Sequence, residues 1–162
     1  MSRATAEVDL GAISRNCASL KEAAGGVRLC AVVKANGYGH GMVPVAEAAL
    51  AGGADWLGVA ATSEALLLRE MGIEAPVLVM GAIERGDVPT LRQANCDIVC
   101  WTAEALDWAS EAPGTRVHIK IDSGMGRLGT RDPMEAVAIA QRAHQSEAIE
   151  LVGVTTHFAT AD

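Results

Sequence analysis

Short runs of apolar residues recur along the chain and alternate with segments in which apolar residues return at helical spacing. The runs have the length of strands, and glycine or polar residues bound most of them. They predict strands at 29–33, 56–60, 76–80, 97–101, 117–121 and 151–155. Most of these runs are continuous rather than alternating, which indicates strands that are covered on both faces.

The segments between the runs predict amphipathic helices. Asp9, Thr62, Thr102 and Asp132 stand where an N-cap is expected, and Pro133 suits the first position of a helix. The predicted helices span 10–21, 43–50, 63–71, 85–93, 103–110 and 134–144.

The strict alternation of strand and helix, without hairpin signals, predicts an α/β fold with a parallel sheet. Such a sheet is either doubly wound or a (β/α)8 barrel of the TIM type. The chain has 162 residues and six strand-helix units, whereas a full barrel needs about 250 residues. Because the chain stops directly after its sixth strand, we expect residues 1–162 to be one partial barrel domain with the first six β/α units.

Composition narrows the function. Half of the residues are hydrophobic but only 3% are aromatic, so the core is built from Ala, Val, Leu and Ile. The net charge of -7 argues against nucleic acid as a partner. No segment has the length of a membrane span or the pattern of a signal peptide, so we expect a cytoplasmic protein without a membrane partner.

Four cysteines are present: Cys17, Cys30, Cys96 and Cys100. Their spacing matches no zinc motif, and we expect no metal site. Free, buried thiols are the preferred interpretation.

The first candidate for chemistry is Lys34, which directly follows a predicted strand. Functional groups of parallel α/β folds gather at the carboxyl ends of strands, and a partly desolvated amine there can act as a nucleophile. Gly37, Gly39 and Gly41 would let the backbone approach a ligand, and Tyr38 adds a hydroxyl. The alternative is a lysine that extends to the surface beside an ordinary turn.

A second cluster begins on the fifth strand, where Arg116, His118, Lys120 and Asp122 alternate with apolar residues. Polar groups on one strand face must reach water, partner charges or a site. The glycine-rich turn that follows presents Arg127, whose guanidinium suits a phenolate, phosphate or carboxylate. A solvated strand end with salt bridges is the alternative.

His157 follows the sixth strand and completes the set, although a histidine there is often a hydrogen-bonded core residue. Lysine, arginine, histidine and tyrosine at one mouth suit Schiff-base chemistry on an anionic carbonyl compound. A class I aldolase and a pyridoxal-phosphate enzyme both fit, and spacing alone does not separate them.

The run from 31 to 41 resembles the pyridoxal-phosphate attachment motif of alanine racemases, through Val33-Lys34-Ala35-Asn36, Tyr38 and His40-Gly41. Further matches follow in the family's order, and the resemblance spans essentially the whole chain. They are Glu7-Val8-Asp9-Leu10 with Ala12, Ile13 and Asn16, then Ala54-Asp55, Glu64-Ala65, Leu68-Arg69, the run 121–129 and His157-Phe158-Ala159.

The resemblance implies a role for each candidate. Lys34 would attach pyridoxal 5'-phosphate as a Schiff base and act as the base on one face of the substrate Cα. Tyr38 would bind the cofactor phosphate, and Arg127 the phenolic oxygen of the cofactor and the substrate carboxylate. His157 would lie beside the pyridine ring. Lys120 matches a position that is carbamylated in some family members.

The resemblance also implies racemisation of alanine by a homodimer, which supplies D-alanine for peptidoglycan. The second base would be a tyrosine from a C-terminal β-domain of the partner subunit. That domain is absent from these 162 residues, so we expect the chain alone to be inactive.

Two other functions stay open. One is a related racemase with another amino-acid preference, and the other is a non-catalytic module that binds pyridoxal phosphate or forms oligomers. The run 36–41 argues against a decarboxylase.

Overall fold

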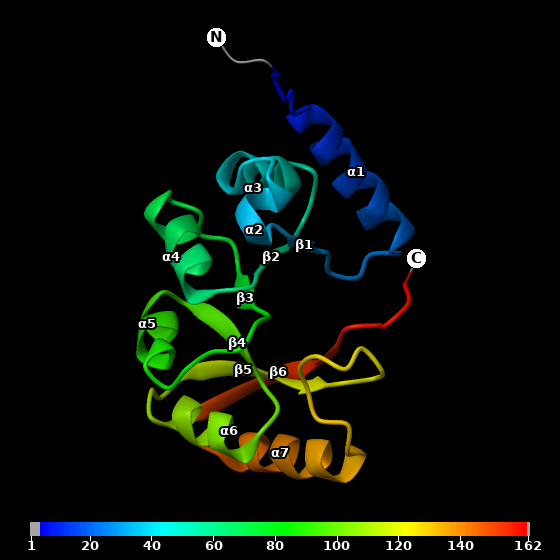
Figure 1. Cartoon of the computed structure of the whole chain (residues 1–162). Helices are drawn as coiled ribbons and strands as arrows, with labels where there is room; N and C mark the ends of the chain where they lie inside the picture. Colours follow the sequence, from blue (N-terminus) through cyan, green and yellow to red (C-terminus); the bar gives the residue numbers. More distant parts are fainter. Residues whose placement is uncertain (1–3, 162) are drawn as a thin grey trace.

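The computed structural model describes residues 4–161 and contains a six-stranded parallel sheet whose strands alternate with helices (Figure 1). The strands are β1 (Cys30–Val32), β2 (Trp56–Val59), β3 (Val77–Val79), β4 (Cys96–Cys100), β5 (Thr115–Ile121) and β6 (Ile149–Thr156). The helices are α1 (Leu10–Ala23), α2 (Lys34–Tyr38), α3 (Met42–Ala51), α4 (Thr62–Glu70), α5 (Asp87–Gln93), α6 (Ala103–Ser110) and α7 (Pro133–Gln145). All six predicted strands are confirmed, and α2 is the one helix that the apolar spacing did not predict.

The strands follow one another in the sheet in chain order, from β1 to β6, and every neighbouring pair is parallel. A doubly wound sheet reverses its strand order at a switch point, so this order excludes it. Helices α3 to α7 lie along the outside of the curved sheet (Figure 1). The predicted barrel-type α/β fold is therefore confirmed over the six strands that the chain contains.

The hydrophobic core lies between the sheet and this outer layer of helices. Alternate strand residues such as Leu57, Val79 and Ile98 point into it and are fully buried. Leu68, Leu91 and other apolar helix residues meet them from outside. Because the strands bury one face against helices, the side chains on their other face are left to line the interior of the curve.

Three of the four predicted helix caps are confirmed. Asp9, Thr102 and Asp132 accept hydrogen bonds from first-turn backbone N–H groups. The prediction for Thr62 is wrong, because Thr62 is already inside α4 and the N-cap residue is Ala61. Ala61 has no side-chain oxygen, and the interaction at this helix start is the reverse one, in which Glu64 Oε2 accepts from the backbone N–H of Ala61 at 3.2 Å.

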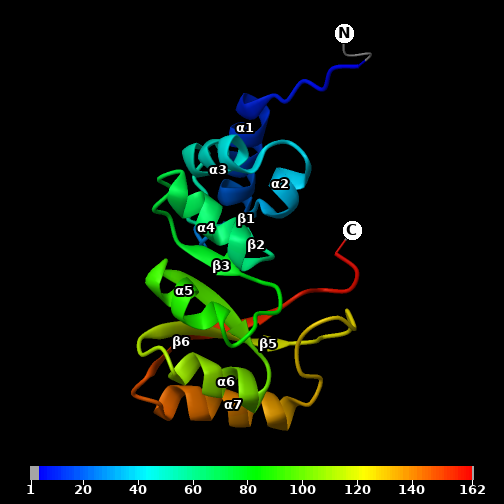
Figure 2. The ribbon, with the colours of Figure 1, turned by 60° about the vertical axis from the view of Figure 1, so that its left-hand side comes forward.

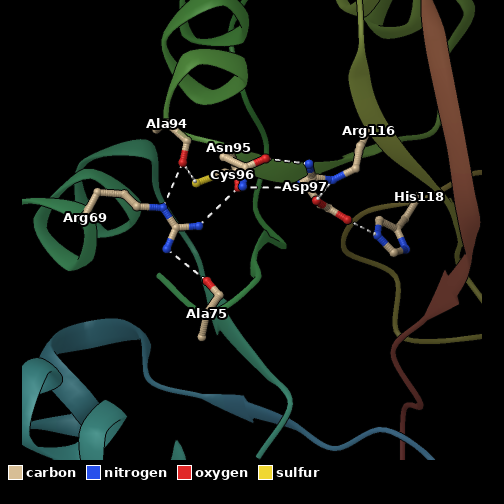
Figure 3. Close-up of polar contacts among 8 residues, drawn as sticks. All are labelled: Arg69, Ala75, Ala94, Asn95, Cys96, Asp97, Arg116 and His118. Atoms are coloured by element: carbon tan, nitrogen blue, oxygen red, sulfur yellow. Dashed lines mark hydrogen bonds and ion pairs between the residues drawn. The ribbon is translucent and has the colours of Figure 1, made fainter. Parts of the chain in front are cut away.

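The interior face carries an ion network at the amino ends of β4 and β5 (Figure 3). Asp97 is fully buried, and its carboxylate accepts from Arg116 Nε at 2.5 Å and lies 2.9 Å from His118 Nε2. Arg69 links the neighbouring backbone by donating to the carbonyls of Ala94 and Ala75 (Figure 3). Arg116 and His118 of β5 are thus engaged with Asp97 within the fold. Lys120 and Asp122, further along the same strand and its end, lie at the carboxyl edge of the sheet.

Burial tests the prediction for the cysteines. Cys17, Cys96 and Cys100 are free and buried, but the prediction for Cys30 is wrong because Cys30 is exposed on the edge strand β1.

Within residues 4–161, no helix is both long and apolar enough to cross a membrane.

Adjacent leucines of α4 test the position of the core. Leu68 is fully buried and Leu67 is 41% exposed. We expect Leu68→Ala to lower the free energy of unfolding by about 3 kcal/mol, because it removes buried methyl groups and leaves a cavity. Leu67→Ala should lower it by less than about 1 kcal/mol. Urea denaturation of both variants measures the difference, and equal losses would contradict this packing.

Candidate active site

A cavity of about 290 Å³ opens at the carboxyl ends of the strands. The lining brings together the five site residues predicted from the sequence: Lys34, Tyr38, Lys120, Arg127 and His157. We call this cavity the strand-end cavity. In Figure 2, α2, the loop after β5 and the C-terminal segment lie on the same side of the sheet. Residues separated by more than a hundred positions therefore share one site because parallel strands end at one edge.

Lys34 begins a turn with the opposite hand to an ordinary helix. The residues Ala35, Asn36, Gly37, Tyr38 and Gly39 all have positive φ, between 52° and 85°. This backbone is unfavourable by roughly 1–2 kcal/mol for each residue with a Cβ atom, so contacts must hold it. Asn36 provides one, since its Oδ1 accepts from the Met42 N–H at 3.0 Å.

Side chains within this turn take different positions. Lys34 is half-buried, and its Nζ lies 5.9 Å from the centre of the Tyr38 ring. Tyr38 itself is 59% exposed. His40 Nδ1 lies 3.1 Å from the carbonyl oxygens of both Gly37 and Tyr38, so His40 braces the turn and is not among the cavity-lining residues.

The loop that carries Arg127 is organised around Asp122. One carboxylate oxygen of Asp122 accepts from the backbone N–H groups of Gly124 and Gly126 at 3.0 and 2.9 Å. The other accepts from Arg131 Nε at 2.9 Å. These contacts, led by the Gly126 N–H, lower the pKa of Asp122 to about 2. The sequence singled out Asp122 as part of a polar strand face but did not identify its role as the centre of this loop.

Lys120 is only 5% exposed, although its side chain reaches the strand-end cavity. Burial lowers the pKa of its amine, and the nearby positive charge of Arg127 lowers it further. No carboxylate within residues 4–161 forms an ion pair with it. Lys120 therefore has a larger neutral fraction than an exposed lysine.

The rest of the lining defines which ligands the cavity suits. Val32, Met80 and Leu128 supply apolar surface, and none of the described lining residues is acidic. Lys34, Lys120 and Arg127 are basic, so the cavity favours an anion. A phosphate-bearing ligand with a flat ring and an aldehyde would match the arginine, the apolar surface and the lysine amine.

Comparison with known proteins agrees with this chemistry. The family model described as "Alanine racemase, N-terminal domain" matches residues 8–162. An alanine racemase of Symbiobacterium thermophilum is 44% identical over 162 residues, which cover 97% of this chain and 43% of that protein. The chain thus spans less than half the length of this relative.

Solved structures give the same result. The alanine racemase of E. faecalis has a TM-score of 0.88 at 38% identity, over 95% of this chain and 43% of that chain. The alanine racemase of Bacillus anthracis with bound L-Ala-P has a TM-score of 0.88 at 41% identity, over 96% and 42%.

The low pKa of Asp122 predicts how the Arg127 loop responds to acid. Because the folded pKa is lowered from 3.8 to about 2, ionised Asp122 stabilises the fold above about pH 4, and this contribution is lost as the pH falls toward 2. We expect Asp122→Asn to be less stable than the parent at pH 7, and the gap to narrow below pH 4. Urea denaturation across this range measures it.

Asp107→Asn is the matched control, since Asp107 pairs with Arg142 on the surface. Removal of an exposed pair should change stability little at any pH. A gap for Asp122→Asn that stays constant down to pH 2 would contradict the assigned ionisation.

Proposed function

Since the chain belongs to the alanine racemase family, we propose that the protein interconverts L-alanine and D-alanine with pyridoxal 5'-phosphate. The observation that carries the proposal is the convergence of Lys34, Tyr38, Arg127 and His157 on one cationic cavity. The D-alanine formed would serve peptidoglycan synthesis.

The residues of the strand-end cavity fit the cofactor. Tyr38 would donate its hydroxyl hydrogen to the phosphate, and Arg127 would donate to the phenolic oxygen. His157 would lie beside the pyridine ring, against which Val32 and Leu128 provide apolar surface. When bound, pyridoxal phosphate supplies the electron sink that makes the Cα proton of an amino acid acidic.

Lys34 has two tasks in this proposal. Its amine holds the cofactor, and it moves the proton on one face of the substrate Cα. The half-buried position of Lys34 at the cavity suits both, because the amine is reachable and partly shielded from water. Arg127 would also hold the substrate carboxylate. The L-Ala-P bound to the Bacillus anthracis relative supports an alanine-sized substrate.

Racemisation also requires a base on the opposite face of Cα. Tyr38 is the one tyrosine in the chain, and we assign it to the phosphate. On the resemblance to the family, we propose that the second base is a tyrosine from a C-terminal β-domain of the partner subunit, in a homodimer of the complete protein.

We further propose that Lys120 is carbamylated. The neutral amine would add to carbon dioxide with formation of an N–C bond, and the released proton would pass to water. The lowered pKa of Lys120 favours the neutral amine that this reaction needs. The product carries a negative charge, so the repulsion between Lys120 and Arg127 would become an attraction that orients the guanidinium.

Replacement of Lys34 tests the proposed function. In the protein expressed from its complete reading frame, Lys34→Ala should abolish the visible absorbance of the attached cofactor. It should also reduce racemisation by about 10³-fold or more, because the amine is both the attachment point and a base. Absorbance titration with pyridoxal phosphate and polarimetry with alanine are the measurements.

Lys21→Ala is the control, because Lys21 pairs with Asp55 and does not line the cavity. It should keep both the absorbance and the activity. Unchanged absorbance in Lys34→Ala would refute the assignment, and cofactor binding without turnover in the parent would favour the non-catalytic module.

Labelling tests the carbamate at Lys120. After equilibration with ¹³C-bicarbonate, we expect one carbamate signal in the carbon NMR spectrum, which is absent in Lys120→Arg. The arginine variant keeps the positive charge but cannot form the carbamate. A spectrum without this signal in the parent would rule the modification out under those conditions.

A further inference from the structure

We propose that Glu64 is a positioning residue for Lys34, an inference that rests on the proposed function. The Glu64 carboxylate accepts three backbone N–H groups from the ends of two different strands. Its Oε1 accepts from Ala35 at 2.7 Å, and its Oε2 accepts from Ala60 at 2.8 Å and from Ala61 at 3.2 Å. One side chain thus links the Lys34 turn to the end of β2.

The contact with Ala35 falls where the chain leaves β1 and enters the left-handed turn. Ala35 directly follows Lys34 and is the first residue of the left-handed turn, with φ of 52°. Within the turn, hydrogen bonds begin later, with the Gly37 N–H donating to the Val33 carbonyl at 2.9 Å. The Ala35 N–H precedes these bonds, as the first N–H groups of any helical turn do, and Glu64 provides its acceptor.

Two side-chain contacts fasten the turn to its neighbours. Asn36 Oδ1 accepts from the Met42 N–H and holds the end that leads into α3. Glu64 holds the end that carries Lys34. Because a left-handed backbone is unfavourable for Ala35, Asn36 and Tyr38, loss of either contact favours relaxation of the turn. Relaxation at the Glu64 end would displace Lys34, whose position in the cavity depends on the backbone beside it.

The two oxygens of Glu64 have separable effects. Oε2 accepts from Ala60 and Ala61 and fastens the start of α4 to the end of β2, which is mainly a contribution to stability. Oε1 reaches the Lys34 turn, which is a contribution to the site. Lys34 and Ala60, which lie on opposite sides of Glu64, both line the strand-end cavity. A capping residue that touches no part of the turn therefore serves as a control for the first effect.

Glu64→Gln is the test variant, in the protein expressed from its complete reading frame. Its single carbonyl oxygen cannot accept on both sides, and its amide N–H₂ would face one of the N–H donors. We expect the dissociation constant for pyridoxal phosphate to rise about 10-fold or more and kcat to fall by a similar factor, because the Lys34 amine is misplaced. KM for alanine should change by less, since Arg127 is untouched.

Thr102→Ala is the matched control. Thr102 caps α6 after β4, and its hydroxyl oxygen accepts from the Ala105 N–H far from the Lys34 turn. It should lower the unfolding temperature as Glu64→Gln does but leave cofactor affinity and kcat unchanged at 25 °C. If Glu64→Gln fails to fold, Glu64→Asp replaces it, because the shorter carboxylate can cap α4 but not span both sides.

The outcomes separate this inference from the proposed function. A parent protein that shows no cofactor absorbance overturns both. A parent that binds cofactor, with Glu64 variants that match Thr102→Ala in affinity and kcat, overturns the positioning role alone. Weakened cofactor affinity and reduced kcat in the Glu64 variants, at equal folded fraction, support it.

Discussion

The chain passes from strand β1 into a left-handed turn directly after Lys34, and the position of Lys34 at the strand-end cavity depends on that turn. Residues from Ala35 to Gly39 all have positive φ, and three of them carry a Cβ atom that makes this backbone unfavourable. The turn persists because neighbouring elements fasten it, through Asn36 to the start of α3 and through Glu64 to the ends of β1 and β2. Strain of this kind is found where a structure must present one side chain in one place, and here that side chain is Lys34.

The interior face of the sheet divides into two parts with different uses of charge. At the amino ends of β4 and β5, buried Asp97 pairs with Arg116 and lies at hydrogen-bond distance from His118 within the fold. At the carboxyl ends, Lys120 and Arg127 face the cavity and form no ion pair within residues 4–161; burial lowers the pKa of Lys120, and the charge of Arg127 lowers it further. The first arrangement uses its charged and polar groups within the fold. The second leaves positive charge available to an anionic ligand.

The strands and most helix caps could be predicted from local sequence patterns. The grouping of the site residues could be predicted from the topology of a parallel sheet. Apolar runs and caps such as Asp9 and Thr102 are read from neighbouring residues, and strand ends in a parallel sheet always meet. The contacts that hold the site were not predictable in this way. Glu64 reaches Ala35 across 29 positions, and Asp97 reaches His118 across 21, which no spacing rule encodes. The prediction for Thr62 failed because α4 begins one residue earlier than predicted, at Thr62 itself, with Ala61 as the N-cap. The left-handed turn was missed since Ala35 and Tyr38 carry no glycine-like signal.

The central claim is that Lys34 is the residue that binds pyridoxal phosphate, and chemical trapping tests it most directly. The protein expressed from its complete reading frame is loaded with cofactor, reduced with borohydride to make the bond permanent, digested and analysed by mass spectrometry. The account predicts that the cofactor mass lies on the peptide that contains Lys34, at about one equivalent. A label on Lys21 or Lys120, or no label at all, would contradict it.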